Sequence, residues 1–90
     1  MLAETQEQAS HIAELMENIV ADNSVPRNIR KIVEEAKNKI LSSEEFDTKV
    51  TSAIYLLDDI SNDINMPSHT RTELWTLISK LEAIREIKKK

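Results

Sequence analysis

The sequence of 90 residues contains no glycine and no cysteine. The absence of glycine excludes Gly-rich phosphate loops and most tight type I′ hairpin turns. The absence of cysteine excludes disulfides, thiolate metal sites and thiol nucleophiles, and it suits a reducing interior. No apolar run approaches the roughly 20 residues that a membrane-spanning helix needs. Several classes of functional site are therefore excluded before any motif is considered.

Positive charge is missing from the start of the chain. Residues 1–22 contain five acidic residues and no lysine or arginine, whereas signal and transit peptides carry basic residues. We therefore expect no targeting segment and predict a cytoplasmic protein. The formal net charge of −4 also argues mildly against a general nucleic-acid-binding protein.

The residues that are abundant favour helices, because Ala, Leu, Ile, Glu and Lys are all good helix formers. Apolar residues recur at helical spacing in four segments, which predicts helices over residues 3–21, 26–41, 43–64 and 67–87. The third segment has the four- and three-residue spacing of a bundle helix, carried by Phe46, Val50, Ala53, Leu57, Ile60 and Ile64. Ser42 and Glu45 have the spacing of a capping box at its start.

One turn motif occurs twice. Residues 22–30 read D-x-S-V-P-x-x-x-R and residues 63–71 read D-x-N-M-P-x-x-x-R, an offset of 41 that includes both prolines. Net charge follows the same period, with acidic segments at 1–22 and 43–63 and basic segments at 23–42 and 64–90. The sequence therefore predicts one domain over residues 1–90, an antiparallel up-down four-helix bundle built from two similar helical hairpins. Its apolar faces fill the interior and leave no obvious residues to line a cavity.

Each turn places charges against the dipoles of its own helices. An aspartate lies at the end of one helix and an arginine near the start of the next, and both positions are electrostatically unfavourable. A tertiary pair between the aspartate and the arginine eight residues later would explain this placement, and it would also bond open backbone groups at the two helix ends. We therefore predict a structural latch at each turn, formed by Asp22, Pro26, Arg30, Asp63, Pro67 and Arg71.

Two constellations resemble reactive sites but lack essential members. Glu7, His11 and Glu14 share a helix face, yet a di-metal bundle needs a second Glu-x-x-His helix that this chain does not have. His69 has hydroxyl neighbours, but hydroxyls at a helix start commonly bond the backbone, and no glycine is available to shape an oxyanion turn. We therefore expect no metal, no cofactor and no enzymatic activity.

The remaining candidates are surfaces. Tyr55 and Trp75 lie off the core stripes of their helices, and Leu15 and Leu56, which are 41 residues apart, flank theirs. Such residues are typical of protein interfaces, and the alternative is that a wide core covers them. Basic residues on the second and fourth helices could contact phosphates or pair with the acidic helices. The candidate nucleic-acid contacts are Arg27, Arg30, Lys31 and Arg71.

The turn motifs also carry a family resemblance. The stretches V-P-R-N-I-R (residues 25–30) and N-M-P-S-H-T-R (residues 65–71), with Trp75 and the Leu81-Glu82 pair, resemble uncharacterised protein family 0147, a group of small archaeal proteins. The resemblance covers nearly the whole chain. It implies a compact all-helical bundle in archaeal cytoplasm, and it implies no activity and no functional residues.

These observations predict a non-enzymatic protein–protein interaction module that self-associates, with a dimer as one form. The alternative is an RNA- or ribosome-associated factor that uses the basic faces of the second and fourth helices. Neither reading involves a membrane or a small-molecule substrate.

Overall fold

The computed structural model describes residues 3–89 of the chain, with side chains for residues 6–86. The described part contains four helices, joined by turns, and no strand. The helices are α1 (Ala3–Val20), α2 (Arg27–Ile40), α3 (Phe46–Ile60) and α4 (Ser68–Lys89). The predicted all-α class is confirmed. Residues 1, 2 and 90 of the predicted domain lie outside the described range.

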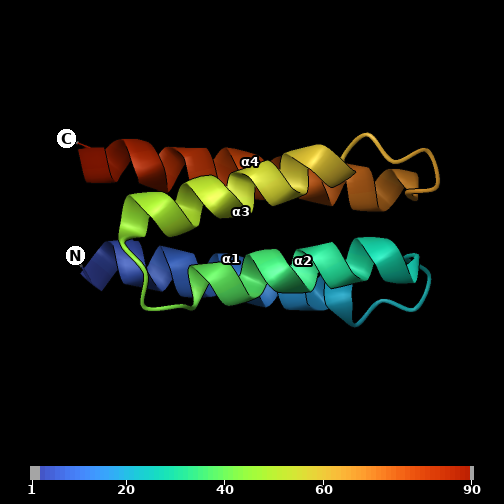
Figure 1. Ribbon diagram of the computed structural model, residues 1–90, viewed down its shortest axis with the longest axis horizontal. Helices are drawn as coiled ribbons and strands as arrows, with labels where there is room; N and C mark the ends of the chain where they lie inside the picture. Colours follow the sequence, from blue (N-terminus) through green and yellow to red (C-terminus); the bar gives the residue numbers. More distant parts are fainter. Residues whose placement is uncertain (1–2, 90) are drawn as a thin grey trace.

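The helices form a bundle in which each helix packs against two others. The packed pairs are α1 with α2, α2 with α3, α3 with α4 and α4 with α1, so that α1 and α3 lie diagonally opposite, as do α2 and α4. Figure 1 shows each helix running back along the one before it. The body measures 37 × 19 × 18 Å. The start of α1, the end of α4 and the α2–α3 loop share one end, and the two repeated turns share the other.

The core reproduces the 41-residue offset. Met16 and Leu57 are both fully buried, and Val33 and Leu74 are as well. Further pairs of buried residues at this offset are Ala9 with Val50, Ile19 with Ile60, Val25 with Met66, Ala36 with Leu77, and Ile40 with Leu81. The two hairpins therefore contribute matching positions to one hydrophobic core, which explains why their apolar spacing agrees in the sequence.

Helix α3 is shorter than the predicted range of 43–64. It ends at Ile60, where the Ser61 hydroxyl occupies the Asp58 carbonyl at 2.7 Å and the Ser61 N–H is shared between the Leu57 and Asp58 carbonyls. Ile64 was predicted to continue the core stripe, and this is wrong: its side chain is 92% exposed in the turn. The apolar spacing alone therefore led us to predict a helix that is too long, because it included Ile64.

The predicted capping box at the start of α3 does not form. The Ser42 hydroxyl instead donates to the Lys39 carbonyl at 2.7 Å and accepts the Glu44 N–H at 3.3 Å, which keeps the segment in a turn. The helix begins at Phe46, and the Glu45 carbonyl accepts the Lys49 N–H at 3.0 Å. A local side-chain bond to the preceding helix therefore competes with the cap.

Thr70 breaks the match between the two hairpins. It is fully buried and its hydroxyl has no hydrogen-bond partner, whereas the residue 41 positions earlier is the fully buried Ile29. A buried hydroxyl without a partner costs about 1–3 kcal/mol. We expect Thr70→Val to raise the free energy of unfolding by about 1 kcal/mol in urea titrations, and Thr70→Ser to lower it because it keeps the hydroxyl and adds a void. A loss of stability in the valine variant would show that the hydroxyl makes a bond.

Candidate interaction surface

Each repeated turn is closed by its own aspartate. The Asp22 carboxylate accepts the Ser24 N–H at 2.9 Å and the Ser24 hydroxyl at 2.7 Å. In the second turn, the Asp63 carboxylate accepts the Asn65 N–H at 2.8 Å. Each bond spans two residues, as in an Asx turn. The two bonds from Ser24 are the main reason that the pKa of Asp22 lies below its usual value, and a weaker contribution comes from His69.

The two turns also bond to each other. Asn28 donates its side-chain N–H to the Asp63 carboxylate at 3.1 Å, and His69 Nε2 lies 3.4 Å from the Asp22 carboxylate. Asn28 and His69 are 41 residues apart, as are the two aspartates. The two hairpins are therefore joined reciprocally at this end of the bundle. The sequence analysis missed this role of Asn28, although the repeat contained the signal.

The predicted side-chain pair between aspartate and arginine within each turn is wrong, whereas the predicted bonds to open backbone groups are present. Arg30 donates from Nε to the Val25 carbonyl at 2.9 Å. Arg71 donates to the Ser61 carbonyl at 2.9 Å and to the Asp63 carbonyl at 3.0 Å. The carboxylates are already engaged over two residues, while the carbonyls of Val25, Ser61 and Asp63 lie between helices and are free to accept from a cation. Each proline directly precedes its helix: the Pro26 carbonyl accepts the Arg30 N–H and the Pro67 carbonyl accepts the Arg71 N–H, both at 3.1 Å.

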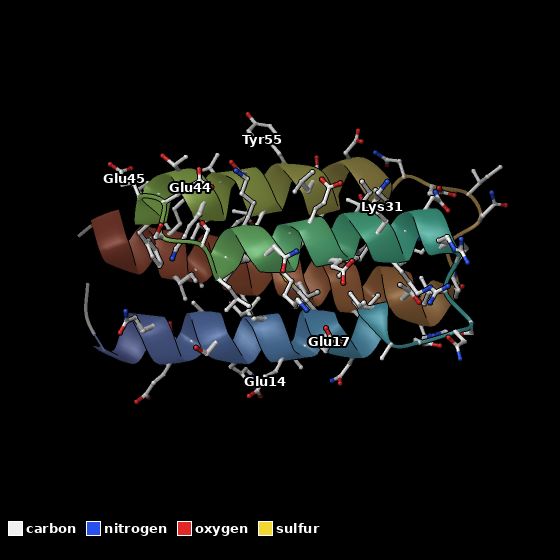
Figure 2. The ribbon with its side chains drawn as sticks, turned by 60° about the horizontal axis from the view of Figure 1, so that its bottom comes forward. Glu14, Glu17, Lys31, Glu44, Glu45 and Tyr55 are labelled. Carbon is white, nitrogen blue, oxygen red and sulfur yellow. The ribbon has the colours of Figure 1, made fainter. Side chains whose placement is uncertain are left out.

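These bonds divide the four basic residues that the sequence offered as nucleic-acid contacts. Arg30 and Arg71 are half-buried and bonded to backbone carbonyls, so their guanidinium groups are engaged within the fold. Arg27 and Lys31 are exposed on α2, and Figure 2 shows Lys31 on the outside of that helix. The basic candidates therefore do not form one exposed set.

The reactive-site candidates remain separate side chains on the surface. Glu7, His11 and Glu14 are exposed along α1, and among the side chains described, those of residues 6–86, no three from His, Cys, Asp or Glu lie close enough to hold a metal ion. His69 is exposed and contacts Asp22, while Thr70 next to it points into the core. The histidine and the neighbouring threonine hydroxyl are thus directed to different environments.

Of the four large apolar side chains that are exposed within residues 6–86, three lie in the second hairpin, and the fourth, Leu41, lies at the C-terminal end of α2 in the first. Tyr55, Ile64 and Trp75 are 72%, 92% and 59% exposed. At the corresponding positions, 41 residues earlier, the first hairpin carries the exposed polar residues Glu14, Asn23 and Glu34. Figure 2 shows one such pair, with Glu14 pointing away from α1 and Tyr55 pointing away from α3. Because the first hairpin occupies an equivalent place with polar residues, the fold does not require apolar residues at these positions.

Leu15 and Leu56 occupy different surroundings from the aromatics. Both are partly buried and pack against the core. Leu15 lines a hollow of about 140 Å³ between α1 and α4, and Leu56 lines one of about 280 Å³ at the junction with α2. The four candidate interface residues therefore do not form one continuous patch.

Open hollows are present where the sequence suggested none. One has a volume of about 480 Å³ and lies between α1 and α4, near the end of the bundle where the chain starts and ends. Its lining includes His11, Ile12, Lys80 and Ile84. The spacing of apolar residues identified the buried face of each helix, but it did not predict the hollow between α1 and α4.

The observed architecture defines a class of small all-α proteins, four-helix bundles made of two matched hairpins. The model of the uncharacterised protein family UPF0147 matches residues 1–84, and the chain belongs to this family. None of the helices within residues 3–89 combines the length and the apolar character needed to cross a membrane.

Archaeal relatives and solved structures agree with this assignment. A UPF0147 protein of Methanothermobacter thermautotrophicus is 45% identical over 84 residues, which cover 91% of this chain and 81% of that one. A crystal structure of a UPF0147 protein from Thermoplasma acidophilum has a TM-score of 0.85 at 34% identity, covering 92% of this chain and 99% of the other. A second crystal structure, of a protein of unknown function, has a TM-score of 0.81 at 45% identity, covering 83% and 86%. The names of these proteins assign no activity.

Proposed function

We propose that this protein is a non-enzymatic helical interaction module that self-associates through the outer surface of its second hairpin. The observation that carries the proposal is the contrast between the hairpins: Tyr55, Ile64 and Trp75 stand exposed where the first hairpin has polar residues. Tyr and Trp are enriched at the energetic centres of interfaces. Two of the three aromatic residues of the chain are exposed here, on adjacent helices.

A second copy of the same chain is the partner that requires the fewest specialised surfaces. A dimer with two-fold symmetry uses the same patch twice, so one self-complementary surface is sufficient. The RNA-binding alternative has weaker support, because two of its four basic residues are bonded to backbone carbonyls. The exposed Arg27 and Lys31 share α2 with the exposed Glu34 and Glu35, which would repel phosphate.

Sedimentation across a range of concentrations tests the proposal. We expect the wild-type protein to exceed the mass of one chain at micromolar concentration, and Tyr55→Glu and Trp75→Glu each to shift it towards a single chain. Each variant introduces the residue that the first hairpin carries at the matching position, so the fold should tolerate it. Glu34→Gln, which changes the counterpart of Trp75, is the matched control and should leave the mass unchanged.

A wild-type protein that stays a single chain at high micromolar concentration would contradict self-association. If its mass exceeded one chain but neither substitution changed it, the interface would lie on another surface.

A further inference from the structure

A strip along the outer face of α4 is uncharged over its first three turns, and the exposed Glu73 lies beside it on the side of α1. Exposed residues there follow the four-, three- and four-residue spacing of a helix–helix seam, namely Ser68, Thr72, Trp75 and Ser79. The corresponding exposed residues of α2 are Arg27, Lys31, Glu34 and Asn38. In a protein of net charge −4, a strip without charges can be covered by another copy of itself without burying like charges along the strip.

The two threonine hydroxyl groups on this side of α4 are already satisfied. The Thr72 hydroxyl donates to the Ser68 carbonyl at 3.3 Å, and the Thr76 hydroxyl donates to the Thr72 carbonyl at 3.1 Å. Each hydroxyl thus has a partner within its own helix. Covering these residues would therefore leave no hydroxyl without a bond, which removes the main cost of burying a threonine.

A hollow lies beside this face on the side of α1. It has a volume of about 140 Å³, and its lining combines the apolar Leu15, Ile19 and Leu77 with the polar Asn18, Thr72, Glu73 and Thr76. Trp75 lies at the same height along α4 as this hollow, but on the side of the helix that faces α3. It is one turn beyond Arg71, whose side chain bonds the turn between α3 and α4. Each copy therefore offers a projecting indole ring on one side of α4 and a hollow on the other.

We propose that two copies pair with their α4 helices parallel, so that Trp75 of each copy enters the hollow beside Thr72 and Thr76 of the other. This inference rests on the self-association proposed above and specifies its geometry. A two-fold axis parallel to α4 brings the α3 side of one copy against the α1 side of the other at the same height. Both rings then meet both hollows. An antiparallel pairing would instead bring α3 side against α3 side and leave the hollows empty.

The single tryptophan of the chain reports on this insertion. Trp75 is the only tryptophan and is 59% exposed in one copy. We expect its fluorescence to shift to the blue, and its quenching by acrylamide to fall several-fold, over the concentration range in which sedimentation shows two chains. An indole ring that is equally accessible to acrylamide in the dimer and the single chain would overturn the insertion.

Thr76→Glu tests the hollow without touching the indole ring. The residue 41 positions earlier is the exposed Glu35, so a glutamate at this position should be compatible with the fold, which circular dichroism can verify. We expect the variant to dimerise at least tenfold more weakly. Thr48→Glu makes the same change at an exposed position of α3 and should leave dimerisation unchanged. Equal dimerisation of Thr76→Glu and wild type would overturn the proposed contact.

The absence of native cysteine allows the helix direction to be measured by oxidation of single-cysteine variants. In the parallel pair, the cysteine of Ser79→Cys in one copy lies at the same height along the helix as the same cysteine in the other copy. This variant should therefore form a disulfide dimer. A mixture of Ser68→Cys and Ser79→Cys that forms mainly the mixed disulfide would indicate antiparallel helices and overturn the proposal. A wild-type single chain at all concentrations would overturn self-association itself, whereas a dimer with the wrong cross-link pattern would overturn only this geometry.

Discussion

Arg71→Met is expected to lower the free energy of unfolding by about 2–3 kcal/mol, roughly twice the loss expected for Arg30→Met. Arg71 donates two bonds, to the Ser61 and Asp63 carbonyls at 2.9 and 3.0 Å. Arg30 donates one, to the Val25 carbonyl. Hydrogen bonds from a charged group contribute about 1.5–3 kcal/mol each, and the half-exposed position of both arginines reduces that value. Methionine retains most of the apolar stem, so the comparison isolates the lost hydrogen bonds.

Urea unfolding followed by circular dichroism gives both values. Arg71→Lys serves as the control for charge, because lysine keeps the positive charge but cannot hold two carbonyls in a fixed geometry. It should fall between the wild type and Arg71→Met. Equal losses for the two arginine-to-methionine variants would show that the number of carbonyl bonds does not determine the effect.

Leu57→Ala is expected to lower the free energy of unfolding by about 3–4 kcal/mol, because Leu57 is fully buried and its removal leaves a cavity. Its neighbour Leu56 is only partly buried against the same core, so Leu56→Ala should cost about 1–2 kcal/mol. The same urea titrations measure both. Sedimentation of Leu56→Ala then separates two roles for this leucine.

If Leu56 mainly packs within its own chain, the variant loses stability while its native mass stays unchanged. A variant of normal stability with a reduced native mass would restore Leu56 to the interface. This comparison addresses the one pair of candidate residues, Leu15 and Leu56, that the fold directs partly inwards.

Most of the fold was predictable because both of its signals are periodic. Helical spacing located the buried stripes, and the 41-residue offset predicted two hairpins whose buried residues correspond, as Met16 and Leu57 do. The ends of α3 were not predictable, since single bonds from the Ser42 and Ser61 hydroxyls to nearby carbonyls determine them. The spacing of apolar residues does not show where a side-chain hydroxyl competes with the backbone for a carbonyl.

The site was predictable only in part, for a similar reason. Counting turns showed that Tyr55 and Trp75 leave the core face, and both are exposed. Counting charges suggested pairs between aspartate and arginine, but the carboxylates bond within two residues and across to the other turn. Which of several nearby acceptors a side chain reaches depends on distances that the sequence does not contain. The hollow beside Thr72 depends on the separation of α1 from α4 in the same way.

The position of the chain ends has a consequence for how the bundle is connected. The start of α1 and the end of α4 lie at the same end of the bundle as the loop between α2 and α3 (Figure 1), and the opposite end is joined by reciprocal side-chain bonds. The packing of the four helices therefore does not depend on which hairpin comes first in the sequence. A chain that began with the second hairpin and ended with the first could enclose the same core, so the order of the halves is a property of the polypeptide and not of its folded architecture.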